Sequence, residues 1–385
     1  MTHVATRSAQ ALLAAVLAIP LVAAEPEIAI EVSEDVPLEV VASDFGNSNF
    51  EPRGSALIIE LDGSIRFRHT GEAAVRAVTL AIDAYGGRLG GRAAVAVPSL
   101  HARTGEEFEI YLNLRMVRPL PLPPGAAVRI APDGVLFDTL DAAGPNRLDS
   151  VRKMTVRELE ARRDRQYFLS QWETGGRAAL ASAIQASLHR QATRPRLGVR
   201  LAGEGPATAG SDTREVQFSF IQNADAPLIL EGGTVLVSGL VADSPRIRLR
   251  NRTDETVRHF EIGWLVRDGA GSVYSAGAAP VGEARRLRPG EAVETGGDRR
   301  FELRPAGAGQ PAALESMTAF VRNAQFDDGR VWIPSRQALE ESPLLQTMPV
   351  SVEERRLTQL YRERGPAVVA AELEKLTERT AAVDQ

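Results

Sequence analysis

The sequence of 385 residues contains no cysteine. Disulfide bonds, thiolate metal sites, cysteine nucleophiles and a lipid-modified N-terminal cysteine are therefore excluded, and the folded parts must be stabilised by their own packing. A basic excess is missing as well, since 45 Lys and Arg face 50 Asp and Glu, for a net charge of -5. A mildly acidic chain lacks the electrostatic footprint of a nucleic-acid binder.

Turn-forming residues are plentiful, with 33 Gly and 23 Pro, while 44% of the residues are hydrophobic. This composition is typical of a globular protein with many turns and short strands, and it argues against an all-helical fold. A chain of this length is too long for one ordinary core. We expect two or three domains.

The first 24 residues have the pattern of a secretory signal peptide. Arg7 precedes an apolar stretch from Ala11 to Ala24 that Pro20 interrupts, and the acidic Glu25 follows. The alternative is an uncleaved anchor, but the run is shorter than the roughly 20 residues that a membrane span needs. We predict cleavage after Ala24 and a periplasmic or secreted protein with a net charge of -6, from 44 basic and 50 acidic residues.

The second half of the chain repeats a sequence pattern of the first half. The tetrapeptide IRFR at residues 65–68 recurs as IRLR at residues 247–250, an offset of 182 (247 minus 65). Next come two alternating apolar sets, Val78, Leu80 and Ile82 in the first copy and Phe260, Ile262 and Trp264 in the second. Alternation with period two places each set on one face of a half-buried strand.

Turn signals repeat at corresponding places. Residues 104–106 (TGE) match residues 289–291 (PGE), and each copy contains an Asp-Gly step, Asp133-Gly134 or Asp328-Gly329. Asp-Gly tolerates the positive φ angles of a tight turn, so we predict that each copy closes with a β-hairpin there. An immunoglobulin-like or fibronectin-like β-sandwich with Trp264 in its core fits this pattern, and a small Greek-key barrel is the alternative.

A helical part follows each copy. Residues 155–158 (TVRE) and 351–354 (SVEE) have the form of a capping box, and glycine breaks follow at Gly175-Gly176 and Gly365-Pro366. Beyond the breaks, apolar residues are spaced by four, namely Leu180, Ile184 and Leu188 in one copy and Val369 and Leu373 in the other. We predict two helical hairpins that pack on each other or on the sandwiches, because so narrow an apolar stripe must be covered.

The predicted fold class is mainly β with appended helices (α+β), built from two immunoglobulin-like or fibronectin-like sandwiches that are each followed by a helical hairpin. The predicted segments are a signal peptide (1–24), a first β-sandwich (25–140), a first helical hairpin (141–193), a linker (194–213), a second β-sandwich (214–340) and a C-terminal helical hairpin (341–385).

Each candidate site in the sequence has a plainer explanation. The histidines His69, His101, His189 and His259 have no metal-binding spacing. Asp327-Asp328 resembles part of a calcium loop but lacks further carboxylates, so a turn explains it better.

The charged run 158–165 suits an acidic partner, yet its mixed signs favour a solvated helix face with i,i+4 pairs. Residues 251–253 (NRT) fit the glycosylation pattern but lie in a predicted turn.

Trp172, Trp264 and Trp332 suggest a platform for stacking carbohydrate. Against this, Trp264 lies on the inward register and aligns with Ile82, and a position that accepts an aliphatic residue in the other copy is more often core than ligand platform. No catalytic, metal or cofactor residue is assigned from the sequence.

Residues 144–148 (GPNRL), 154–168 (MTVRELEARRDRQYF) and 331–335 (VWIPS) resemble an uncharacterised group of secreted bacterial proteins, over most of the mature chain. The resemblance implies export and tandem immunoglobulin-like or fibronectin-like units. It brings no activity, ligand or cofactor. Wider relatives of that architecture mostly serve in adhesion, assembly or spacing.

The sequence thus favours a non-enzymatic exported binding or scaffold protein of the cell envelope, with a protein or envelope component as partner. Neither nucleic acid nor, after cleavage, an integral membrane segment is expected. The alternative is an envelope polysaccharide-binding protein or hydrolase that uses acids such as Asp83, Glu106 or Asp328. A third hypothesis is an assembly factor that adds a strand to an open sheet edge.

Overall fold

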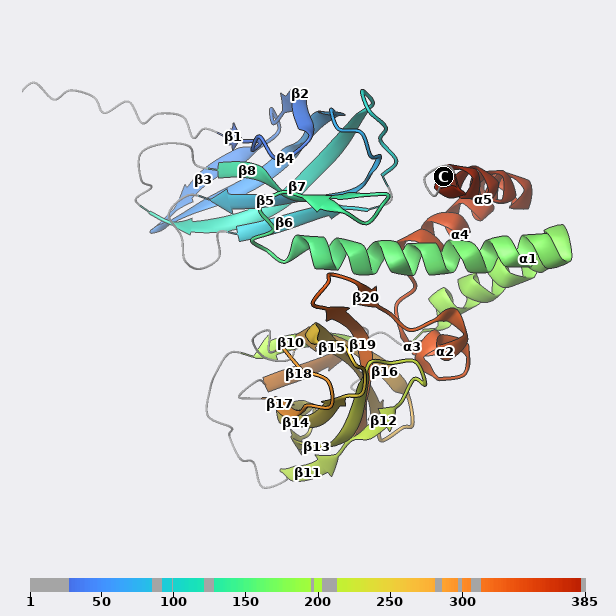
Figure 1. The fold of residues 1–385 in the computed structure, drawn as a ribbon. Helices are drawn as coiled ribbons and strands as arrows, with labels where there is room; N and C mark the ends of the chain where they lie inside the picture. Colours follow the sequence, from blue (N-terminus) through green and yellow to red (C-terminus); the bar gives the residue numbers. More distant parts are fainter. Residues whose placement is uncertain are drawn as a thin grey trace, which may run out of the picture.

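The computed structural model describes residues 28–84, 92–98, 100–120, 128–194, 197–202, 213–280, 286–296, 300–305 and 313–381. The predicted signal peptide lies outside the described residues. The fold is mainly β with appended helices, as predicted. Two β bodies lie on opposite sides of the long helix α1, and the C-terminal helices gather near its far end (Figure 1).

The first β body consists of two sheets that face each other over one apolar core. One sheet contains β1 (Ile28–Ile30), β5 (Val75–Ala84), β6 (Arg92–Val97), β8 (Val128–Phe137) and β9 (Ala142–Ala143). The other contains β2 (Leu38–Asp44), β3 (Asn49–Arg53), β4 (Ala56–His69) and β7 (Glu107–Pro119). Phe67 from one sheet and Ile82 from the other are fully buried in the shared core. The inward register predicted for Ile82 is therefore confirmed.

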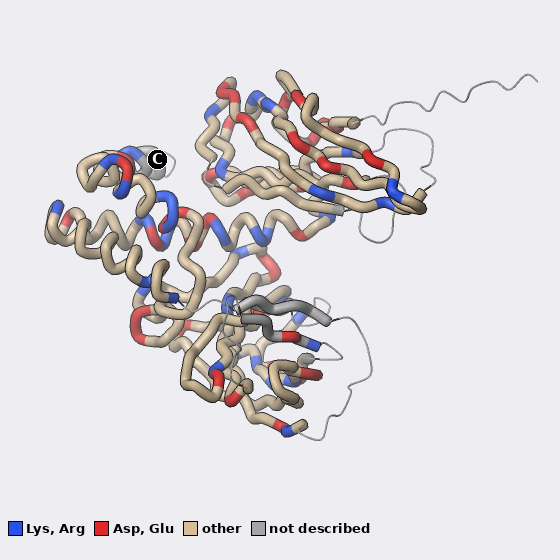
Figure 2. The backbone as a smooth tube through the Cα atoms, turned by 180° about the vertical axis from the view of Figure 1, so that it is seen from behind, with Lys and Arg blue, Asp and Glu red and all other residues tan. Residues whose placement is uncertain are grey.

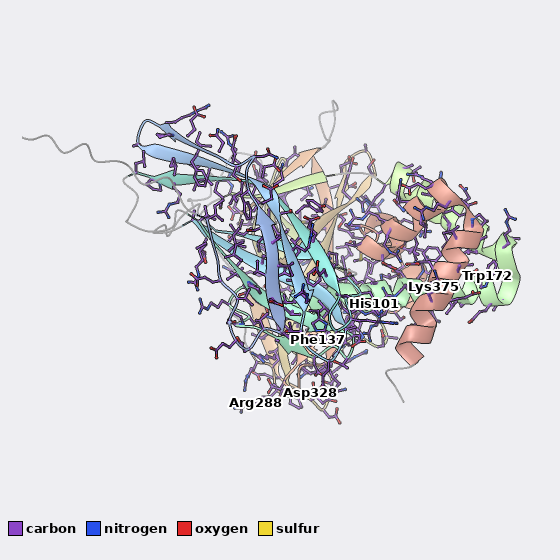
Figure 3. All side chains as sticks on the ribbon, turned by 90° about the horizontal axis from the view of Figure 1, so that it is seen from above. His101, Phe137, Trp172, Arg288, Asp328 and Lys375 are labelled. Atoms are coloured by element: carbon purple, nitrogen blue, oxygen red, sulfur yellow. The ribbon has the colours of Figure 1, made fainter. Side chains whose placement is uncertain are left out.

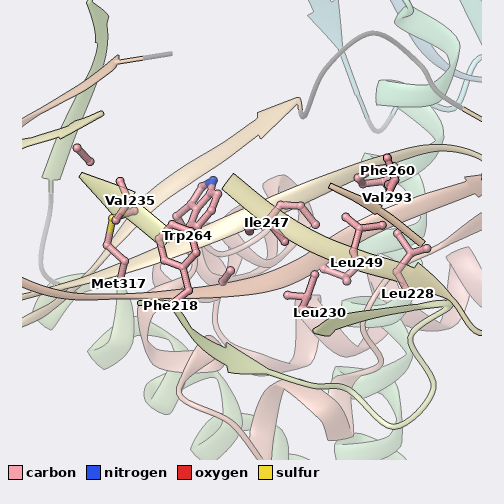
Figure 4. Close-up of a cluster of buried hydrophobic side chains, with 14 of the residues drawn as sticks. Phe218, Leu228, Leu230, Val235, Ile247, Leu249, Phe260, Trp264, Val293 and Met317 are labelled. Carbon is pink, nitrogen blue, oxygen red and sulfur yellow. The ribbon is translucent and has the colours of Figure 1, made fainter. Parts of the chain in front are cut away.

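The second β body is also built from two sheets. One contains β10 (Leu197–Ala202), β11 (Arg214–Gln217), β13 (Leu228–Ser238), β14 (Val241–Asn251), β17 (Ala292–Gly296) and β18 (Arg300–Pro305). The other contains β12 (Ser219–Ile221), β15 (Val257–Asp268), β16 (Val273–Pro280), β19 (Leu314–Phe326) and β20 (Val331–Trp332). Trp264 is buried between them, 4.9 Å from the Phe218 ring (Figure 4). Its predicted core position is confirmed, while β10 falls in the range predicted as a linker.

The two bodies share their strand connectivity. The order β1-β8-β5-β6 in the first returns as β12-β19-β15-β16 in the second, and in each the short first strand runs parallel to its neighbour. The turns at Gly105 and Gly290 also correspond, because their N–H groups donate to the carbonyls of His69 and Asn251, respectively. Both glycines have positive φ angles, 79° and 74°, which an L side chain rarely adopts.

One predicted hairpin turn is wrong. Asp133-Gly134 lies inside β8, because the buried Asp133 carboxylate accepts hydrogen bonds from the N–H groups of Arg147 (2.8 Å) and Leu148 (3.1 Å). The chain turns instead after Phe137 and enters β9. The turn predicted at Asp328-Gly329 is confirmed, since it joins β19 to β20 and Gly329 has a φ of 90°.

Helix α1 (Ser150–Thr193) is interrupted at Gly176, whose φ and ψ are 60° and -150°. It begins before the predicted capping box, so that prediction is wrong: the Thr155 hydroxyl donates to the Val151 carbonyl inside the helix. The second predicted cap is confirmed, because Ser351 Oγ accepts the Glu354 N–H at 3.0 Å.

The remaining helices are α2 (Arg336–Glu340), α3 (Leu344–Thr347), α4 (Val352–Arg364) and α5 (Pro366–Ala381). Phe168 and Ile184, on opposite sides of the Gly176 interruption, share an apolar cluster with Leu357 of α4 and Val369 of α5. The two parts of α1 therefore pack together with the C-terminal helices. No helix among the described residues is long and apolar enough to cross a membrane.

Candidate functional site

Charged side chains on α1 form a buried series of ion pairs, which we call the α1 ion-pair belt. Basic and acidic residues follow one another along the helix (Figure 2). The predicted solvated face at residues 158–165 is wrong, because Glu158 and Asp164 are 4% and 0% exposed. Burial is tolerated because other elements supply arginine partners.

Glu158 attaches α1 to the first β body. Its Oε1 lies 2.7 Å from Arg165 Nη2 and 3.1 Å from Arg162 Nε, and Arg76 Nε of β5 lies 4.0 Å away. Arg162 also donates to the Asp138 carbonyl in the turn after β8. Burial lowers the pKa of Arg76, and the Glu158 carboxylate opposes this shift. Ion pairs thus join α1 to the first β body, and each buried charge is stabilised by its oppositely charged partner.

Arg152 attaches the same helix to the second β body. Its Nη1 donates to Glu261 Oε1 of β15 at 2.8 Å and to Asn323 Oδ1 of β19 at 3.3 Å. Asn323 Nδ2 in turn donates to Glu261 Oε2 at 3.0 Å. Burial acts to raise the pKa of Glu261, but attraction to Arg152 and these hydrogen bonds outweigh it, so the pKa is lowered.

The C-terminal helices join the belt through two acids. Asp164 Oδ1 accepts from Arg163 Nε at 3.0 Å and lies 3.8 Å from Arg336 Nη1 of α2. Arg336 Nη1 also lies 3.7 Å from Glu354 of α4, whose Oε1 accepts from Arg190 Nη2 at 2.6 Å. Ion pairs of α1 therefore reach both β bodies and the C-terminal helices, in separate groups along the helix.

A groove of about 660 Å³ lies between α1 and residues 331–336. Arg162, Arg163 and Arg336 line it together with Tyr167 and Trp332, and no acidic side chain of the described residues does. We call it the arginine groove. The Arg336 guanidinium carbon lies 3.8 Å from the centre of the Tyr167 ring, and Arg163 Nη1 donates to the Pro334 carbonyl at 3.2 Å. The guanidinium groups are held in place.

A second hollow, of about 430 Å³, lies against β5, β8 and the segment that follows β1 in the first β body, and we call it the polar cleft. Its polar lining includes Glu31, Asp35, Asp83, Arg129 and Arg147. Two of these lining residues, Glu31 and Arg129, form an ion pair at 2.5 Å. The sequence proposed Asp83 as a site residue but none of the other four.

The acids that the sequence proposed for hydrolysis lie apart. Asp83 lines the polar cleft, whereas Glu106 Oε2 accepts the Arg103 N–H at 2.8 Å within a turn. Asp328 is paired with Arg330 at the surface of the second β body. Among the described residues, no group of three or more His, Asp or Glu side chains is arranged to hold a metal ion.

His69, His189 and His259 lie on separate elements. His69 is fully buried at the end of β4, and neither ring nitrogen has a hydrogen-bond partner. His259 lies on β15, where burial, followed by the charge of Arg152, lowers its pKa. His189 lies on the second part of α1.

The three tryptophans form no common platform. Trp264 is core, Trp332 lines the arginine groove, and Trp172 Nε1 donates to Glu374 Oε1 of α5 at 3.0 Å. Figure 3 shows Trp172 among the helices, well separated from Asp328. A stacking surface made by all three is therefore ruled out.

Comparison with known proteins gives little. No family model and no curated protein matches the chain. A solved structure named "pT26-6p" is similar with 10% identity and a TM-score of 0.11, covering 88% of this chain and 74% of that one. A structure of infectious bursal disease virus, Gx strain, has 8% identity and a TM-score of 0.14, covering 74% and 72%. These scores support no inference on fold or function.

Proposed function

We propose that the protein is an exported, non-enzymatic binding or scaffold protein of the cell envelope. In this proposal its two β bodies are immunoglobulin-like sandwiches, each followed by a helical hairpin, and residues 1–24 direct export. The shared strand connectivity supports a duplicated unit. The α1 ion-pair belt supports a frame with a fixed relative orientation of the two bodies.

The observation that carries the proposal is the arginine groove. Each guanidinium group has five N–H donors in a rigid fork. Arg163 uses part of its fork on Asp164 and the Pro334 carbonyl, and Arg336 is stacked on Tyr167. Groups fixed in this way lose less side-chain entropy when they bind a partner. Arginines beside Trp332 and Ile333 suit an acidic protein segment with apolar neighbours.

The test is capture of a partner from envelope extract by the mature chain. Gln166→Trp should fill the groove, because Gln166 is exposed and lines it. Gln185→Trp, an exposed position on the second part of α1, is the matched control. We expect Gln166→Trp alone to lose the partner. Equal capture by both variants, or turnover of a substrate by the purified chain, would contradict the proposal.

The alternative proposal is an envelope polysaccharide-binding protein or hydrolase, and the polar cleft favours it. Carboxylates and guanidinium groups at one hollow can bind sugar hydroxyl groups. A binding assay with soluble envelope polysaccharide should then lose affinity on Asp83→Asn, and hydrolysis, if present, should stop. Binding that is unchanged by Asp83→Asn would dismiss this alternative.

A further inference from the structure

The outer edge of β7 is the longest regular sheet edge of the first β body. β7 pairs with β4 over thirteen consecutive residue pairs with no register shift, and the described residues provide no partner on its other side. Natural edge strands are usually short, bulged or interrupted by proline. β7 has none of these three features, since its proline is its last residue, Pro119, but it does carry charged side chains, which also protect sheet edges.

The second β body shows that the same edge accepts another strand. β17 and β18 pair with β14 as β7 pairs with β4. There β10 adds antiparallel to β18, from Leu197 opposite Pro305 to Ala202 opposite Arg300. β16 of the facing sheet contacts β10, whereas its counterpart β6 contacts β7 itself.

The sequence of β7 is complementary to itself when two copies run antiparallel. Glu107 and Glu109 lie in its first half and Arg115 in its second half, on the outer face with the 72% exposed Tyr111. If Leu112 faces its own copy, Glu109 lies opposite Arg115. If Tyr111 faces its own copy, Glu107 lies opposite Arg115. Opposite charges facing each other stabilise paired strands, and like charges destabilise them.

We infer that β7 pairs with β7 of a second copy of this chain, about an axis near Tyr111 and Leu112. The two sheets then become one continuous sheet across the dimer. The inward residues Ile110, Leu112 and Leu114 extend the apolar layer through the junction. The inference does not depend on what binds the arginine groove.

Single-cysteine variants test the geometry, because the chain contains no cysteine. Tyr111→Cys should give a covalent dimer with a short bismaleimide crosslinker, since neighbouring and diagonal positions on paired strands lie within roughly 8 Å. Glu39→Cys, an exposed position on β2 at the opposite edge of the same sheet, should not. Equal crosslinking of both variants, or of neither, would overturn the inference.

A charge exchange tests the pairing itself. Glu107→Arg with Glu109→Arg in one chain, and Arg115→Glu in another, should each weaken self-association about tenfold in sedimentation equilibrium. Mixing the two variants should restore dimers, because in either register Arg115 and the introduced arginine that faces position 115 then both lie opposite glutamates. Circular dichroism checks that both variants are folded. A wild-type chain that stays monomeric at all concentrations, or a mixture no better than its components, contradicts the dimer.

Discussion

Arg152 of α1 and Glu261 of β15 form a hydrogen-bonded ion pair with 2.8 Å between Nη1 and Oε1. Their residue numbers differ by 109, and their side chains are 4% and 18% exposed. The helix that follows the first β body is therefore attached to the second body by an ion pair whose arginine is almost completely shielded from water. Removing one member of such a pair is far more costly than removing a surface ion pair.

Arg152→Ala should lower the free energy of unfolding by about 3 kcal/mol, because it leaves the largely shielded Glu261 carboxylate, 18% exposed, without its counter-charge. Urea titration followed by tryptophan fluorescence measures this. Arg53→Ala removes an exposed ion pair to Glu51 and should cause no measurable change. The belt has no structural role if the two variants behave alike.

Glu354→Gln should loosen the C-terminal helices. The change leaves Arg190 and Arg336 without a shared carboxylate, which we expect to cost about 2 kcal/mol. Hydrogen exchange in α4 should become about 30-fold faster. Glu363→Gln, an exposed change on the same helix, should leave the exchange unaltered. Unchanged protection from hydrogen exchange in Glu354→Gln would contradict a stabilising role for these ion pairs.

His259 should make stability depend on pH. Its pKa is lowered in the folded state by burial and by Arg152, so the unfolded chain binds more protons just below the ordinary value of about 6.5. The contribution of His259 to stability is complete above that pH, and it is lost as the pH falls toward the pKa that His259 has in the folded state. Thermal melting between pH 7.5 and 5.5 should show a smaller decrease for His259→Gln than for the wild type. Identical curves would refute this.

Gly263→Ala should destabilise the second β body. A Cβ at this position would lie 2.2 Å from Phe320 Cζ, so the ring must move, and overpacking of this kind costs about 3 kcal/mol. Gly232→Ala is the matched control on β13, where nothing lies within 4 Å. Its melting temperature should not fall. A similar loss in both variants would place the effect in the backbone instead of in packing.

His69→Asn should stabilise the first β body by about 1 kcal/mol, because it copies the second. At the corresponding position Asn251 Nδ2 donates to the carbonyls of Glu255 (2.7 Å) and Leu287 (2.9 Å), whereas the buried His69 ring makes no hydrogen bond. Urea titration measures the free energy of unfolding and shows whether the substitution raises or lowers it. Destabilisation would mean that the two turns are not equivalent.

The β part of this fold was predictable because its signal is local. Ile82 and Trp264 sit where period-two alternation places them, and the glycine turns at Gly105 and Gly290 follow from one short motif. The turn predicted at Asp133-Gly134 is wrong for a reason that no local sequence pattern contains. The donors that bind Asp133 come from residues 14 to 17 positions later.

The candidate site was not predictable in the same way. The charges of residues 158–165 look the same on a solvated helix and on a buried one, since i,i+4 pairs such as Glu158 and Arg162 occur on both. What distinguishes them is Arg76 on β5 and Arg336 on α2, which only the tertiary fold brings to α1. Segments 154–168 and 331–335 gave a resemblance but no indication that they meet at one groove.

The distance between the two β bodies tests the central claim, that α1 and its ion pairs hold them in one fixed arrangement. Spin labels at Glu39→Cys and Arg248→Cys, both exposed, suit pulsed electron double resonance with the labelled chain diluted in unlabelled chain. We predict one narrow distance distribution that broadens when Arg152→Ala is added. A broad distribution in the chain with its ion pairs intact would contradict the account.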